Sequence, residues 1–325
     1  MIIGGASLLG SHLCERLLSR GDQVIAVDDF TSGSFATLSH LKGQAGFSFI
    51  EHDMRAQLSA RKLDAIVHLA LPSSRRAYES DPVRSTLTSV VGTVHALELA
   101  ADHDARLVIA TSPERWGQGV RCAESLVVDF TKTRKVDVRM VRVASAYGPR
   151  MPADDPHVVM RFVRQAMRGE TLTFDVDGTH RLSFVADAVD TLLRTLDADL
   201  RVPAVAAPYI DVTTSAVAHA VLDATSNAGV TIVSSSEPPP GSGNGPSTSM
   251  PMSMPYSMRP TTPEALPATI VFGQAAAKSL ADGVAETMRW FESRTASLAA
   301  PPRTSGIFGV RPGVPDAKPD TKTGT

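Results

Sequence analysis

Residues 2–13 read IIGGASLLGSHL. A short apolar run leads into a turn that contains Gly4, Gly5 and Gly10, and leucines then recur at positions 9, 13 and 17, the spacing of one helix face. Gly21 follows as a predicted helix stop. A strand, a glycine turn and a helix in this order place free backbone N–H groups and the positive helix end where a pyrophosphate can rest. We therefore predict a dinucleotide-binding unit at the N-terminus.

Two residues qualify that prediction. Ser7 occupies the position where such loops usually have glycine, so we expect its Cβ to push the pyrophosphate outward or to require a different turn. Asp28 ends the next predicted strand, at the distance where an acid hydrogen-bonds the adenosine ribose. Its charge would repel a 2′-phosphate, which favours NAD over NADP. The alternative is a glycine turn that serves only close strand–helix packing.

Composition narrows the functional class. The chain has 325 residues, 43% of them hydrophobic, and a formal net charge of −2 from 32 basic and 34 acidic residues. This balance indicates neither a nucleic-acid nor an anionic-membrane surface, so we expect small-molecule ligands. We find no signal peptide and no apolar run long enough to span a bilayer, and Cys14 and Cys122 both lie in helix-like stretches. We therefore expect a cytoplasmic protein.

Strand-like runs alternate with helical patterns through the first half of the chain. Helical periodicity is clearest at Val83, Leu87, Val90, Val94, Leu97 and Ala101; this stripe fits the sheet or a partner subunit equally well. The predicted strands cover 23–27, 47–50, 65–69, 106–110 and 136–143. Such alternation predicts an α/β fold, a Rossmann-type doubly wound parallel sheet, in a domain over 1–150.

After residue 150 the alternation loosens, which predicts a smaller C-terminal substrate lobe over 151–295. We expect helices near 158–168 and 186–196, strands near 171–174 and 182–185, and a last helix over 274–294. Residues 234–267 are rich in Ser, Pro, Gly and Met, a composition typical of a mobile loop. Residues 296–325 are expected to form a disordered tail.

Two other kinds of site are disfavoured. The stretch GASLL lacks the second glycine of a G-x-S-x-G nucleophile elbow. The nine histidines are scattered, and the DHD at 102–104 fits a solvated helix end, so we predict no metal site.

A series of stretches, taken in order, carries a family resemblance. They are IIGGASLLGSHL (2–13), VDDFTSG (27–33), HDM (52–54), HLALPSSRRAYESDP (68–82), VVGT (90–93), AYGPRM (146–151), FVRQAMRGETLT (162–173) and THRLSFV (179–185). Together they resemble the extended short-chain dehydrogenase/reductases, the NAD-dependent epimerase/dehydratase family, and within it the UDP-glucuronate decarboxylases. The similarity covers roughly residues 1–200 and returns at Met258-Arg259-Pro260 and in the final helix.

The resemblance implies NAD as cofactor and a nucleotide sugar, a UDP-sugar, as substrate. It places Asp28 at the ribose, Asp53 and Met54 beside the adenine, and Leu69 and Ala70 beneath the cofactor. The full cofactor set it implies is Gly4, Ser7, Leu8, Leu9, Gly10, Asp28, Asp29, Phe30, Ser32, Gly33, Asp53, Met54, Leu69 and Ala70. The substrate positions it implies are Tyr78, Ser145, Arg150, Arg181 and Arg259, whose arginines suit phosphate and carboxylate oxygens.

The catalytic centre departs from the family pattern. Family enzymes use a tyrosine as proton acceptor and a lysine four residues later that lowers its pKa. The stretch PERWGQGVRCAES (113–125) aligns there through Arg121, Ala123 and Glu124, which places Trp116 and Val120 at those positions. An indole only donates and valine carries no charge.

Other catalytic positions of the family also differ. The catalytic Thr111 and Ser112 remain, but Pro113 follows where the decarboxylases have glutamate, and the long loop before the tyrosine is absent. Family asparagines are replaced by Ser89 and Ser145.

Two functions follow from these observations. One is a binding or scaffolding pseudoenzyme that retains the fold. The other is an active nucleotide-sugar epimerase, dehydratase or decarboxylase whose base is Tyr147, Glu114 or Tyr78. In either case we expect a homodimer, or a heterodimer with a related subunit, through the stripe from Val83 to Leu97.

Overall fold

The structure is a computed structural model that describes residues 1–71, 75–113, 117–200, 204–227, 229–234 and 264–299. Its large sheet is built from parallel pairs in the order β13-β10-β6-β5-β4-β1-β2-β3. The strands are β1 (Ile2–Ile3), β2 (Val24–Asp28), β3 (Phe47–Glu51), β4 (Ala65–His68), β5 (Arg106–Thr111), β6 (Val138–Arg142), β10 (Ala204–Ala206) and β13 (Leu266–Pro267). The predicted Rossmann-type parallel sheet is confirmed.

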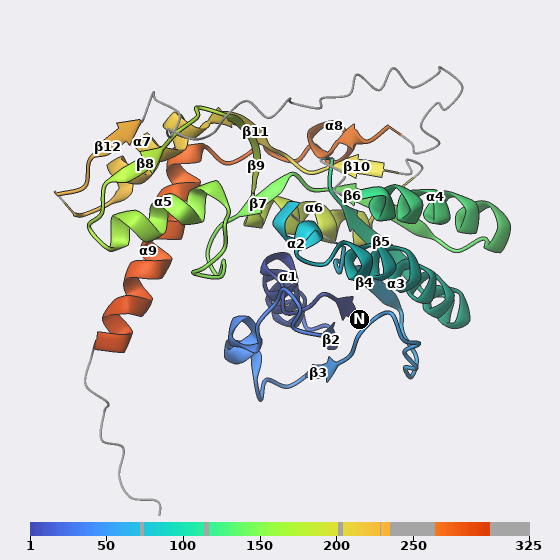
Figure 1. The fold of residues 1–325 in the computed structure, drawn as a ribbon. Coiled ribbons are helices and arrows are strands. Elements are labelled where there is room, and N and C mark those ends of the chain that lie inside the picture. Colours follow the sequence, from blue (N-terminus) through green and yellow to red (C-terminus); the bar gives the residue numbers. More distant parts are fainter. Residues whose placement is uncertain (72–74, 114–116, 201–203, 228, 235–263, 300–325) are drawn as a thin grey trace, which may run out of the picture.

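Helices cover both faces of this sheet (Figure 1). On one face α1 (Leu8–Ser19) packs beside α6 (Val185–Asp197), and on the other α3 (Pro82–His103) packs beside α4 (Gly117–Arg134). Successive residues of a strand belong to hydrophobic cores on opposite faces of the sheet. Val67 and Val108 lie in the core on the α1 side, whereas Ile66 and Leu107 lie in the core on the α3 side. Because the central strands are buried on both faces, they read as continuous apolar runs in the sequence.

The remaining elements form a smaller lobe at one end of the molecule (Figure 1). One small sheet has the order β11-β9-β7 and another pairs β12 with β8. The strands are β7 (Ser145–Tyr147), β8 (Leu172–Phe174), β9 (Thr179–Phe184), β11 (Ile210–Thr213) and β12 (Ile232–Ser234), and the helices are α5 (Val158–Met167), α7 (Thr214–Ala224) and α9 (Leu280–Ala299). Short elements elsewhere are η1 (Phe35–Leu41), α2 (Arg75–Ser80) and α8 (Ala268–Phe272).

The last helix begins later than the sequence indicates. It starts at Leu280 rather than at 274, because the preceding segment is tied to α6: the Gln274 amide donates to the Asp187 carbonyl, and the Lys278 N–H donates to the Asp187 carboxylate. The helix also runs to Ala299, into the range predicted as a tail; residues 300–325 lie outside the described part.

Two further sequence expectations concern the predicted loop over residues 234–267 and the predicted domain boundary at residue 150. Of the predicted loop 234–267, residues 235–263 lie outside the described residues, but Leu266–Pro267 forms β13 and pairs with β10. Both strands join the large sheet from beyond residue 150, so a domain boundary at 150 stays a prediction.

The apolar stripe on α3 divides between core and surface. Leu97 is buried beneath the helix, whereas Val83 and Leu87 are 70% and 43% exposed. In the described part of the chain no helix is long and apolar enough to cross a membrane.

Candidate functional site

The glycine turn links β1 to α1 at the carboxyl edge of the sheet. Gly4 has φ +82°, and an ideal Cβ there would lie 3.0 Å from the backbone of Leu69 and Ala70. A Cβ on Gly10 would lie 2.7 Å from Cα of Gly5. Both positions therefore require glycine, the first for its left-handed backbone and the second because the helix starts directly on the turn. Leu69 and Ala70 thus flank the turn, and their position beneath the cofactor stays a prediction.

Ser7 caps the helix that follows. Its φ is −75°, so its side chain causes no backbone strain. Oγ donates to the Gly4 carbonyl over 2.7 Å and accepts from the Gly10 N–H over 3.1 Å. The first-turn amides of Leu8 and Leu9 have no acceptor within the helix, because an α-helix leaves its first N–H groups unpaired. Those two amides are the donors left to an anion.

Asp28 fastens the turn to the end of β2. The carboxylate is buried and accepts from the Ala6 N–H and the Phe30 N–H, each over 2.9 Å. Burial raises the pKa of Asp28 above its ordinary value. Each oxygen keeps one further lone pair, so ribose hydroxyls can still donate to it. The chain then folds back over the turn: Phe30 has φ +56°, Ser32 is exposed, and a Cβ on Gly33 would lie 2.9 Å from the Ala6 backbone.

A charged cluster joins the ends of β2 and β3 to the start of α3. Arg84 donates to the carboxylate of Asp29 over 2.8 Å and reaches that of Asp53 at 3.5 Å. Hydrogen bonds from Arg55 lower the pKa of Asp53 to about 2. Met54, between them, is buried. The predicted cofactor residues on these elements therefore gather at one edge of the sheet, where ligands of open α/β sheets bind.

The positions of the family's catalytic pair lie on α4 and just before it. Val120 is 1% exposed, so an apolar, fully buried side chain stands at the lysine position. Gly119 packs α4 on α3, since its ideal Cβ would lie 3.0 Å from Cβ of Ser89. Trp116 and Glu114 lie outside the described residues.

Thr111 ends strand β5 at the same edge of the sheet, and Ser112 follows it. Thr111 is buried, and its Oγ1 has no hydrogen-bond partner among the described residues. Within the described part of the chain its hydroxyl is therefore a buried polar group without a partner.

Tyr147, one of the substitute bases, is fully buried. Its ring meets Phe184 edge-on at 5.5 Å, and its hydroxyl has no partner among the described residues. Burial raises the pKa of Tyr147. Deprotonation of this phenol is therefore costly, and no substrate hydroxyl can reach it without a rearrangement.

The predicted substrate residues have separate partners. Arg150, with φ +72°, forms an ion pair with Glu15 on α1, whereas Arg181 on β9 pairs with Asp211 at 3.1 Å and covers the Tyr209 ring at 4.5 Å. Arg181 is exposed, since alternation along β9 turns its neighbour Leu182 inward. Their substrate roles stay predictions.

Two of the other three substrate positions lie within the described residues. Ser145 starts β7 and Tyr78 is partly exposed on α2. Arg259 lies outside the described residues.

Sequence reasoning passed over His157, Arg161 and His180. The first two are four residues apart at the start of α5, and the third lies on β9. The only sequence signal was the spacing in HVVMR, because the β9 contribution depends on the tertiary fold. In the residues that the structure describes, no group of three or more His, Cys, Asp or Glu side chains is placed to hold a metal ion.

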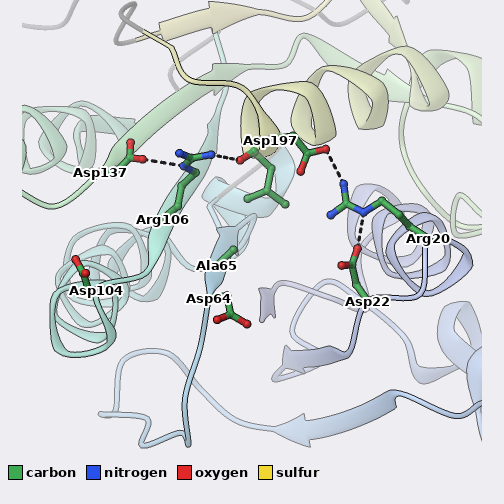
Figure 2. A pocket seen from close by; sticks show the side chains of 9 residues that line it. Arg20, Asp22, Asp64, Ala65, Asp104, Arg106, Asp137 and Asp197 are labelled. Atoms are coloured by element: carbon green, nitrogen blue, oxygen red, sulfur yellow. Dashed lines mark hydrogen bonds and ion pairs between the residues drawn. The ribbon is translucent and has the colours of Figure 1, made fainter.

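A cleft of about 490 Å³ lies at the opposite, amino-terminal edge of the sheet (Figure 2). Three of its five acids are engaged with arginines: Arg20 pairs with Asp22 and Asp197, and Arg106 with Asp137 at 2.7 Å. We interpret these contacts as structural ties between strand starts and α6, since ligands of such sheets bind at the other edge.

Sequence comparisons place these features in context. The model of the NAD dependent epimerase/dehydratase family matches residues 1–205. UDP-glucuronic acid decarboxylase 4 of Arabidopsis thaliana is 36% identical over 226 residues, 61% of this chain and 51% of that protein. UDP-glucuronic acid decarboxylase 5 of the same plant is 34% identical over 227 residues, 61% of this chain and 66% of that protein. The chain thus spans about half to two thirds of the length of these relatives.

Solved structures share the fold at lower identity. The UDP-glucose 4-epimerase of Thermotoga maritima, solved with UDP-glucose, has a TM-score of 0.72 and 19% identity and covers 90% of this chain and 98% of its own. The Bordetella bronchiseptica enzyme WbmF, solved with NAD⁺, has a TM-score of 0.72 and 19% identity and covers 92% of this chain and 93% of its own.

Proposed function

Because the chain belongs to the NAD dependent epimerase/dehydratase family, we propose that it is an NAD-binding and nucleotide-sugar-binding protein with impaired redox catalysis. It is related to the UDP-glucuronate decarboxylases, and NAD is the cofactor of its family. UDP-sugars are the proposed ligands, as the names of its relatives and structural neighbours suggest. A cytoplasmic location and a homodimer, or a heterodimer with a related subunit, belong to the same proposal.

The glycine turn supports NAD binding. The N–H groups of Leu8 and Leu9 lie in the first turn of α1, which leaves them available to a pyrophosphate, and Asp28 keeps lone pairs for ribose hydroxyls. When bound, NAD supplies a hydride acceptor for a sugar carbinol. In an active enzyme of the family, the protein itself makes two contributions: it holds the dinucleotide and it removes the hydroxyl proton.

The second of these contributions is the one that the chain lacks. The observation that carries the proposal is the buried, uncharged Val120 where family enzymes have a lysine. Without that cation nothing at this position lowers the pKa of a proton acceptor, and Trp116 offers only an N–H donor. Loss of a general base alone typically slows a reaction by about 10²–10⁴-fold.

Among substitute bases, Tyr147 is disfavoured by its complete burial. The specific observation that favours an active enzyme is Tyr78, a partly exposed phenol on α2. In that alternative Tyr78 accepts the hydroxyl proton, and Tyr78→Phe abolishes turnover while NAD binding persists.

The test combines binding and turnover on the same sample. The protein, incubated with NAD⁺ and UDP-glucuronate, is expected to bind both by calorimetry and to yield neither NADH nor a UDP-pentose. Turnover that scales with protein concentration contradicts the impairment. Absence of NAD binding contradicts the family function as a whole.

A further inference from the structure

The charged cluster at the carboxyl ends of β2 and β3 contains one arginine that comes from a helix, Arg84 of α3. Asp81 caps this helix, and Arg84 lies in its first turn, where the helix has no acidic side chain. The helix dipole opposes a cation at this end, because it favours negative side chains there. The position of Arg84 is therefore explained by its contacts and not by the helix that carries it.

Asp29 is the carboxylate that holds Arg84. Nη2 of Arg84 donates to Asp29 over 2.8 Å and to Oγ1 of Thr31 over 2.7 Å, and Asp29 also accepts from the Thr31 N–H over 2.9 Å. Burial alone would raise the pKa of Asp29, but the hydrogen bonds from Thr31 and Arg84 outweigh it and lower that pKa. Asp29 is therefore ionised at neutral pH and paired with Arg84.

The other carboxylate of the cluster, that of Asp53, is committed to a different arginine. Nε of Arg55 donates to its two oxygens over 3.1 Å and 2.9 Å, whereas Arg84 lies 3.5 Å from it. Arg84 therefore depends mainly on Asp29 for its charge partner.

Arg84 also keeps unused hydrogen-bond donors. Its contacts with the two carboxylates and with Thr31 all use Nη2, and neither Nε nor Nη1 has a partner among the described residues. Its side chain is 33% exposed, so a ligand group can reach it. A guanidinium presents its donors as a planar fork that suits two oxygens of one phosphate. Arg84 is thus a phosphate receptor whose charge is already occupied.

We propose that Asp29 is a second determinant of cofactor choice, because it occupies the arginine that would otherwise bind the 2′-phosphate of NADP. The proposal rests on the proposed function, in which the adenosine ribose of the dinucleotide lies at Asp28. Asp29 directly follows Asp28 at the end of β2, so this placement brings the ribose next to the pair of Asp29 and Arg84. In Rossmann folds an arginine near that ribose accommodates a 2′-phosphate. Asp28 would act by repulsion, whereas Asp29 withholds the receptor.

The test measures the ratio of NADP⁺ affinity to NAD⁺ affinity by calorimetry on the full chain. Asp29→Asn keeps an acceptor for the Thr31 N–H but removes the charge that holds Arg84. The ratio is expected to rise by about tenfold or more, the effect of a hydrogen bond to a charged group. The matched control is Asp22→Asn, at a partly exposed acid that pairs with Arg20 at the opposite edge of the sheet. It should leave the ratio within about twofold.

A double-mutant cycle separates capture of the phosphate by Arg84 from a simple loss of repulsion. In an Arg84→Gln background, Asp29→Asn is expected to raise the ratio by no more than about threefold, because the receptor is gone. Removal of repulsion alone would give the same gain in both backgrounds. Arg84→Lys keeps the charge without the fork, so in this background only part of the gain should remain. This variant also completes the cycle if Arg84→Gln does not fold.

The outcomes distinguish this proposal from the function on which it rests. If NAD⁺ binds but Asp29→Asn leaves the ratio unchanged, or if the gain is equal with and without Arg84, the proposal is wrong. If neither dinucleotide binds to the unaltered chain or to any variant, the proposed cofactor function itself fails. A gain of about tenfold or more that disappears together with Arg84 supports the proposal.

Discussion

The Tyr147 ring packs directly on the backbone of Gly283: an ideal Cβ on that glycine would lie 2.9 Å from Cζ of the tyrosine. The contact joins β7, which follows strand β6 in the chain, to helix α9 near the end of the described residues. It closes the space around the phenol, whose hydroxyl is left without a partner among the described residues. Tyr147 is therefore a packing residue inside the smaller lobe, where it joins β7 to α9.

Replacing Tyr147 by phenylalanine tests that interpretation. Tyr147→Phe removes an unpaired buried hydroxyl and keeps the ring, so the free energy of unfolding should stay equal or rise by up to about 1 kcal/mol. Chemical denaturation measures it, with Tyr209→Phe, at an exposed tyrosine, as control. A clear loss of stability in Tyr147→Phe would show that the hydroxyl has a hydrogen bond in solution.

Two substitutions of Ser7 should separate its effect on NAD affinity from its effect on helix stability. Ser7→Gly should tighten NAD binding by about two- to tenfold, because it removes the Cβ next to the pyrophosphate, at a cost of only a few tenths of a kcal/mol in helix capping. Ser7→Ala keeps the Cβ and loses the cap, which costs about 1 kcal/mol of stability. Calorimetry and thermal melts distinguish the two. Equal NAD affinity in all three proteins would mean that the serine does not hinder the cofactor.

Asp28 should decide between NAD and NADP. We expect the charged carboxylate to lie beside the ribose and to repel a 2′-phosphate, so the unaltered chain should bind NAD(H) more tightly than NADP(H). Asp28→Asn removes the charge and keeps an acceptor for the Ala6 N–H, so the preference should shrink. Competition titrations measure the ratio. A chain that prefers NADP(H), or a ratio unchanged in Asp28→Asn, is incompatible with this role.

The exposed part of the α3 stripe predicts self-association or pairing with a relative. Val83 and Leu87 are large apolar side chains on the surface of α3. Leu87→Asp should halve the mass of a homodimer by light scattering and leave the melting temperature of the monomer unchanged. Ile270→Asp, at an exposed apolar residue of α8, is the control. A monomer at micromolar concentration before any substitution, with no complex with a relative, rules out this interface.

The sequence predicts the parts of the fold that depend on local pattern. Buried parallel strands such as β5 give apolar runs, and α1 gives leucines at positions 9, 13 and 17, so both were located within a residue or two. The two-residue strand β13 carries too little pattern to be recognised, whereas the equally short β1 is marked by the glycine turn that follows it. The late start of α9 depends on hydrogen bonds to Asp187, which no local pattern encodes.

The site was predictable to the same extent. The glycine turn and Asp28 follow from spacing along one βαβ unit, and the structure joins them through the Ala6 N–H. The ion pair of Arg181 with Asp211 depends on the pairing of β9 with β11. The contact of Arg84 with Asp29 likewise needs the start of α3 beside the end of β2, a relation between distant segments that periodicity cannot show.

The central claim is that the chain holds its cofactor and nucleotide sugar but does not complete the family's oxidation. The most direct measurement follows NADH and UDP-pentose during incubation with NAD⁺ and UDP-glucuronate, on protein shown by calorimetry to bind NAD. The account predicts neither product above the protein-free background, and little recovery in the double variant Trp116→Tyr, Val120→Lys, because the preceding loop and the glutamate are also absent. Steady turnover by the unaltered protein, abolished by Tyr78→Phe or Glu114→Gln, would contradict it and identify the base.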